Sequence, residues 1–147
     1  MVWMILFFLI GNGIAAAEEN REAIQLEQRY DRESDNPRRQ AGIALDLTKS
    51  RFEQLRAAYD AGNPEQQKTA TEAYRGALDR LQTSVAAARH TGTSKKTEVF
   101  LRQHGRDLDN LKMNVSYFVR PEIEKLGDRA AEVREQILYS IMNPEKD

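Results

Sequence analysis

Residues 59–66, Tyr-Asp-Ala-Gly-Asn-Pro-Glu-Gln, are the stretch that decides the fold of this 147-residue chain. Gly62 can take the left-handed backbone conformation that ends a helix, Asn63 is a favoured N-cap, and Pro64 fits the first position of a new helix. Gln66 stands where the second partner of a capping box is expected. So short a connection makes two helices antiparallel neighbours. The stretch therefore predicts a helical hairpin.

On both sides of this turn the apolar residues recur every three or four positions, which is the period of an amphipathic helix and of coiled-coil seams. The opposite faces carry charged and amide side chains. Four apolar stripes can be followed: Ala41, Leu45, Thr48, Phe52, Leu55 and Tyr59; Tyr74, Leu78, Leu81, Val85 and Ala88; Leu101, His104, Leu108, Leu111, Val115 and Phe118; Ile123, Leu126, Ala130, Val133, Ile137 and Ile141. The sequence predicts an all-α fold, an up-and-down antiparallel bundle of four main helices.

Capping residues mark the other helix ends. Asn36-Pro37 has the cap and the proline of a helix start, and Asn143-Pro144 closes the last helix. Within residues 89–94 we expect a glycine stop at Gly92 followed by a serine cap. Pro121 shifts the last apolar stripe, so the last helix pair should be kinked or broken there.

A weaker helix precedes these four, over residues 19–33. It offers only Ala23, Ile24, Leu26 and Tyr30 for burial. The helix itself is predicted, but its place against the bundle is left open.

The first seventeen residues carry no charged side chain. An apolar run over 2–10 leads into three alanines directly before Glu18, and Ala15 and Ala17 match the A-x-A pattern that signal peptidase accepts. We expect residues 1–17 to be a cleaved signal peptide, which makes the protein exported, periplasmic or secreted. No Lys or Arg precedes the apolar run, so an uncleaved N-terminal anchor is the alternative, although the run is shorter than the roughly 20 residues of a membrane span.

Residues 18–147 are enough for one domain with its own core. The 22 basic and 23 acidic side chains nearly balance, so bulk charge names no partner. The chain has no cysteine, which excludes disulfides, iron–sulfur clusters, thiol nucleophiles and covalent haem attachment. The basic doublets 38–39 and 95–96 are too small to follow a phosphate backbone, so no nucleic-acid partner is expected.

His104 is the one weak candidate for a metal ligand. It occupies an apolar stripe, one turn from Asp107, where its ring should point into the bundle. Carboxylate-bridged di-iron bundles need Glu-x-x-His on two helices, and the chain contains no such motif. We expect a packed His104 with no metal and no cofactor, and a small-ligand or metal-binding bundle that uses His104 is the alternative. His90 should lie near a helix end, where its proton is favoured.

Four glycines fall inside the predicted helices: Gly42, Gly76, Gly105 and Gly127. Each costs up to about 1 kcal/mol relative to alanine. A ligand lying against bare backbone would explain them, but close helix approach or tolerated weakness is the favoured interpretation.

Enzyme motifs are missing. The chain has no Gly-x-Ser-x-Gly, P-loop or dinucleotide fingerprint. Acidic neighbours such as Asp107 and Asp109 lie beside arginine on a polar face, which is typical of solvated residues rather than of an acid–base pair. We therefore expect no catalytic residue, with a hydrolase as the least favoured alternative.

Tyr117, Phe118 and Tyr139 are the candidate partner surface. They lie on the two sides of the Pro121 break, where they could form an exposed binding patch, although aromatic residues at helical spacing are more often core. The expected function is a non-enzymatic protein-interaction or scaffold module of the cell envelope or secreted space. Its expected partner is a protein or a second copy of itself, with membrane contact only through residues 1–17 if they are retained.

Overall fold

The computed structural model describes the backbone of residues 2–144 and the side chains of residues 17–144. Within that range there are helices and no strands: α1 (Val2–Arg32), α2 (Pro37–Ala61), α3 (Pro64–Ala88), α4 (Thr91–Asn114), the 3-10 turn η1 (Tyr117–Val119) and α5 (Arg120–Met142). The all-α prediction is confirmed.

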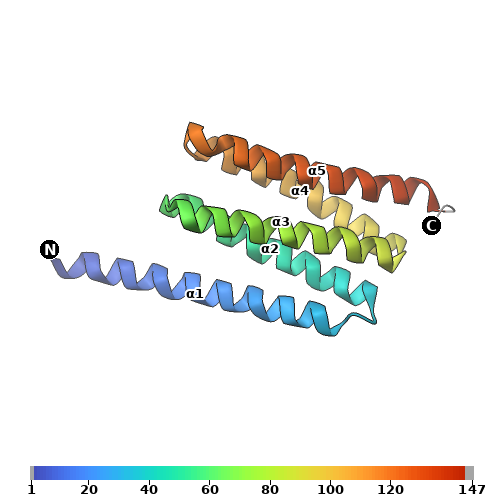
Figure 1. Cartoon of the computed structure of the whole chain (residues 1–147), viewed down its shortest axis with the longest axis horizontal. Helices are drawn as coiled ribbons and strands as arrows, with labels where there is room; N and C mark the ends of the chain where they lie inside the picture. The colour runs from blue at the N-terminus through green and yellow to red at the C-terminus, as the bar shows by residue number, and fades with distance from the viewer. Residues whose placement is uncertain (1, 145–147) are drawn as a thin grey trace.

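The helices run alternately up and down (Figure 1). The hairpin of α2 and α3 packs on the hairpin of α4 and α5, and α1 lies along the outside of the first hairpin, mainly against α2. One end of the bundle, here called the Pro121 end, holds the α2–α3 turn, the α4–α5 connection at 115–119 and the start of α1. The other, the His90 end, holds the α1–α2 connection at 33–36, the α3–α4 turn at 89–90 and the end of α5.

The predicted hairpin turn is present. Gly62 has φ 70° and ψ 18°, in the left-handed region, and its N–H donates to the Tyr59 carbonyl at 3.2 Å. The Asn63 side chain accepts from the backbone N–H groups of Glu65 and Gln66 at 3.0 and 3.2 Å. Asn36 caps α2 in the same way, and Asn143 ends α5.

The α3–α4 turn differs from the prediction. α3 ends at Ala88, and Arg89, not a glycine, takes the left-handed conformation with φ 45°. His90 is the N-cap of α4, since its Nδ1 accepts from the Thr93 N–H at 3.1 Å. Gly92 therefore lies inside the first turn of α4 and Ser94 caps nothing. His90 thus lies at a helix end, as expected, but at the start of α4, where the helix dipole does not favour a positive charge.

The four stripes supply most of the core, with Leu55, Tyr74, Leu101, Leu126 and Val133 all buried. Stripe members near the helix ends are only half-buried, as for Tyr59, Ala88, Val115 and Ile141. Phe118 is not in the core at all, because α4 ends at Asn114 and the following turn carries its ring into solvent.

The break predicted at Pro121 is confirmed. α4 stops at Asn114, and a new helix begins at Arg120 with Pro121 in its first turn. A proline has no N–H to give, so the first turn of a helix, where N–H groups have no partner, is the place that tolerates it.

Polar contacts fix α1 to the bundle where its apolar contacts are few. Ala23 and Leu26 are buried, whereas Ile24, expected to be buried, is 42% exposed. The Glu27 carboxylate accepts from Arg51 of α2 at 2.7 Å and lies 3.6 Å from Arg80 of α3. These ion pairs hold one helix against both members of the neighbouring hairpin.

α1 is one continuous helix across Ala17 and Glu18, the predicted cleavage point. The side chains of residues 1–16, which include most of the predicted signal peptide, lie outside the described residues. Among the residues described in full, no helix is long and apolar enough to span a membrane.

Candidate functional site

The structure does not bring the three candidate partner residues together. Tyr117 and Phe118 lie in η1 at the Pro121 end, and Tyr139 lies near the end of α5 at the His90 end. The α5 rise between Arg120 and Tyr139 separates them by about 28 Å. All three side chains are exposed, by 76%, 89% and 61% respectively. They therefore mark two surfaces, one at each end of the bundle.

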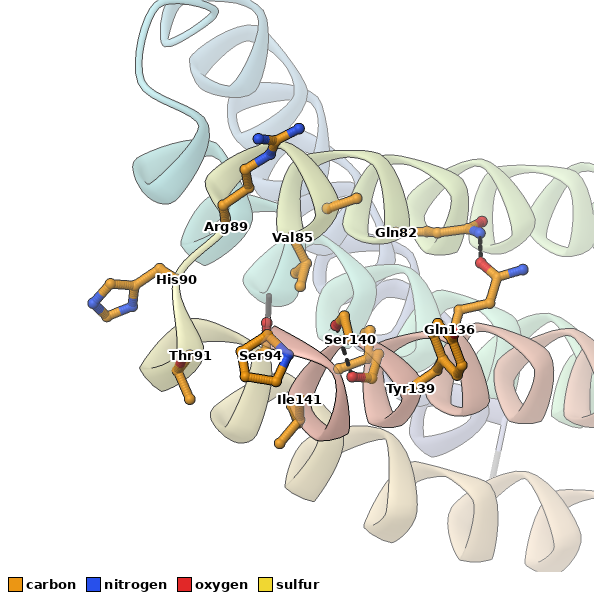
Figure 2. Close-up of a pocket in the computed structure, with 13 residues that line it drawn as sticks. Gln82, Val85, Arg89, His90, Thr91, Ser94, Gln136, Tyr139, Ser140 and Ile141 are labelled. Atoms are coloured by element: carbon orange, nitrogen blue, oxygen red, sulfur yellow. Dashed lines mark hydrogen bonds between the residues drawn. The ribbon is translucent and has the colours of Figure 1, made fainter. Parts of the chain in front are cut away.

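A hollow of about 360 Å³ lies beside Tyr139, between α3, α4 and α5 (Figure 2). Its apolar floor contains Val85, Ile137 and Ile141. Ser94 and Ser140 add hydroxyl groups, while Gln82 donates a hydrogen bond to Gln136 at one side. The hollow thus combines an apolar base with polar walls.

A second hollow, of about 320 Å³, lies on the other side of the α3–α4 turn, between the first turns of α2 and α4. His90 borders both hollows. Arg38 and Lys96, one from each basic doublet, line the second one, and Arg89 lines the first. Residues far apart in the sequence are in this way gathered at the His90 end.

Every charged side chain that lines either hollow, within the described part of the chain, is positive: Arg38, Arg89 and Lys96. None of the three forms an ion pair with a described residue. The chain as a whole has one more acidic than basic side chain, so the charge of the described lining differs from the chain average. It favours an anionic group as the occupant.

The same hollows offer little to a hydrolytic reaction. The His90 ring points away from Ser94 and Ser140 (Figure 2), and its Nδ1 is already engaged by Thr93. Ser140 donates to the Ile137 carbonyl at 2.8 Å. A serine nucleophile needs a histidine within hydrogen-bond reach, and these contacts direct the two groups elsewhere.

His104 lies in the bundle interior, as expected, with 3% of its surface exposed. Its ring stacks on Phe100 with centroids 5.0 Å apart and meets Phe52 edge-on at 4.5 Å. Tyr74 lies 5.6 Å away on α3. Neither His104 Nε2 nor the Tyr74 hydroxyl has a hydrogen-bond partner among residues 17–144.

Burial controls the titration of this pair. It lowers the pKa of His104 to about 4, with Asp107, 3.9 Å from Nδ1, opposing the shift. Burial likewise raises the pKa of Tyr74. Both groups are therefore neutral around pH 7.

A metal ion would find few ligands near His104. Of the carboxylates in the described part of the chain, Asp107 is the one that lies beside its ring. Among the described residues there is no group of three or more His, Cys, Asp or Glu side chains arranged to hold a metal. Structural and catalytic metal sites need three or four such ligands.

The helical glycines do not outline a ligand site. A Cβ built on Gly42, Gly105 or Gly127 would meet nothing within 4 Å, and one on Gly76 would meet only the Arg80 side chain at 3.9 Å. No helix approaches closely at these positions. They are tolerated weak points, as one of the two favoured interpretations held.

Comparisons with family models, with curated proteins and with solved structures find no match to this chain. Its function is therefore inferred from its own residues.

Proposed function

We propose that the protein is an exported, non-enzymatic interaction module that binds a partner protein at the His90 end. The observation that carries the proposal is the pair of hollows whose described charged lining is entirely positive, with exposed Tyr139 at the first of them. The partner supplies an acidic segment with an apolar side chain that enters the hollow between α3, α4 and α5.

Tyrosine and arginine are the residue types most often found at the energetic centre of protein interfaces. Tyr139 offers a ring and a hydroxyl, and Arg89 offers a planar fork of donors that matches a carboxylate. Because the cations are exposed, their attraction should mainly speed association and should weaken with salt.

Site-specific photocrosslinking in cells of the source organism tests the proposal. A photoreactive residue at Gln136, exposed at the wall of the hollow, should capture a protein, whereas the same residue at Glu124, exposed on the same helix at the other end, should not. Arg89→Glu and Lys96→Glu should reduce capture, and Lys125→Glu should leave it unchanged. Equal capture at both positions, or capture that ignores the charge reversals, contradicts the proposal.

A small-ligand or metal-binding bundle that uses His104 is the alternative proposal. Its support is the buried His104 Nε2 that lacks a partner. Elemental analysis and an absorption spectrum of protein from its own source test it: a stoichiometric metal or a chromophore supports it, and two blank results remove it.

A further inference from the structure

The Pro121 end carries large apolar side chains that nothing in the described chain covers. Met113, Tyr117 and Phe118 are exposed by 66%, 76% and 89%. The rings of Tyr117 and Phe118 meet edge-on with centroids 6.2 Å apart, and η1 has no buried residue. We call these three residues the aromatic tip. Exposed apolar groups gathered at one point usually mark a contact surface.

The start of the chain lies at the same end of the bundle. α1 runs antiparallel to α2, and the contact of Gln54 with Asn20 at 3.4 Å sets their register. α2 continues from Gln54 for about two turns to Ala61, so the part of α1 before residue 13, by roughly 3.6 residues per turn, projects past it. Figure 1 shows this projection, and it contains the apolar run 2–10.

We propose that the protein keeps its first residues and rests on a lipid bilayer by its Pro121 end. The run 2–10 enters the hydrocarbon, and the aromatic tip lies in the interface beside it. Tyrosine is enriched at the membrane–water interface because its ring is apolar and its hydroxyl polar, and Phe is a typical residue of the buried face of interfacial helices.

The charges around the aromatic tip indicate whether electrostatic attraction or apolar burial would drive binding to the bilayer. Between residues 109 and 125 the chain has three acidic and three basic side chains: Asp109, Glu122, Glu124, Lys112, Arg120 and Lys125. The α2–α3 turn at the same end adds Asp60 and Glu65, so this end has no excess of positive charge that would attract an anionic surface. Binding is therefore apolar in origin, and should occur on neutral vesicles and survive high salt.

Two weak membrane contacts, one by the run 2–10 and one by the aromatic tip, give strong overall binding when both belong to one rigid body. The ion pairs of Glu27 with Arg51 and Arg80 dock α1 on the hairpin, so the projecting run and the aromatic tip reach the same plane together. A second copy of the chain or a protein are the other possible occupants of the tip, and the experiment separates them from the bilayer.

The chain has no cysteine and one tryptophan, Trp3, which makes a direct test possible. Full-length Phe118→Cys and Tyr139→Cys, each labelled with an environment-sensitive dye, are mixed with phosphatidylcholine vesicles in about 0.5 M salt. We expect the emission of Trp3 and of the dye at 118 to shift to the blue, and the dye at 139 to stay unchanged.

The Tyr117→Ser/Phe118→Ser variant should lower vesicle partitioning at least about tenfold, because two rings leave the interface. Tyr139→Ser is the matched control and should partition like the wild type. Unchanged partitioning of the tip variant overturns the proposal. If the dye at 118 becomes shielded as the protein concentration rises in the absence of vesicles, the tip binds a second copy instead of a bilayer. A mature protein that begins at Glu18, as measured by mass spectrometry, also refutes the bilayer proposal. None of these results bears on crosslinking at the opposite end, so the two proposals fail separately.

Discussion

Replacing His104 by leucine should flatten the acid side of the stability profile. The folded protein holds the pKa of His104 at about 4 because the ring is buried, whereas the unfolded chain has the ordinary value of 6.5. Between pH 4 and pH 6.5 the imidazole is therefore protonated in the unfolded chain and neutral in the folded protein. Stability from this residue is therefore complete above pH 6.5 and is lost as the pH falls toward 4.

The size of the loss follows from the two pKa values. At pH 5 the unfolded state gains about 2 kcal/mol over the folded state relative to pH 7.5, using 1.36 kcal/mol per pKa unit. His104→Leu removes that term. At pH 7.5 the variant should differ little from the wild type, because the ring contacts with Phe52 and Phe100, about 1 kcal/mol each, are lost while an unpartnered buried nitrogen is removed.

Urea unfolding of the wild type and of His104→Leu at pH 7.5 and pH 5 measures the effect. The carboxylates contribute equally in the two proteins, so the difference between their pH dependences comes from His104. The wild type should lose about 2 kcal/mol more than His104→Leu between the two pH values. His90→Asn keeps a capping side chain without an imidazole and should retain most of the wild-type slope. Equal slopes for wild type and His104→Leu would refute the inference that a buried neutral His104 controls acid stability.

Three further predictions, at a glycine, a helix cap and an ion pair, are tested by unfolding and exchange measurements. Gly105→Ala should raise the unfolding free energy by about 0.5–1 kcal/mol, because its Cβ meets nothing, while Gly92→Ala should not, since its Cβ would lie 2.9 Å from the His90 ring. His90→Ala should lower that free energy by about 1 kcal/mol by removing the α4 cap, and His90→Asn should restore it. Glu27→Gln should speed amide hydrogen exchange in α1 while leaving α4 unchanged, because Arg51, itself nearly buried, loses its carboxylate; equal exchange in both helices would contradict this.

Local signals predicted most of the fold. The Gly62-Asn63-Pro64 turn and the amphipathic helices depend on residues that are close together in the chain, so both can be predicted from the sequence. The prediction of the α3–α4 turn was wrong because the His90 imidazole acts as the cap and Arg89 takes the left-handed position. Neither is the residue type usually found there.

The sequence predicts which residues belong to the candidate surfaces, but not where on the bundle these residues lie. The sequence singles out Tyr117, Phe118 and Tyr139, and all three are exposed. Helical spacing tells which face a residue occupies but not how far along the bundle it lies, so the separation of Tyr139 from the other two was not visible. Arg38 and Lys96 line one hollow because of how the α2–α3 hairpin packs on α4 and α5, which no local sequence pattern predicts.

The up-and-down order of the helices has a consequence for how the chain reaches its structure. α2 packs chiefly on α3, and α4 on α5, each pair joined by a few residues. Low contact order of this kind is typical of domains that fold within microseconds to milliseconds. A chain without cysteine needs no oxidation step either, so helix formation and hairpin packing are the only steps that its sequence requires.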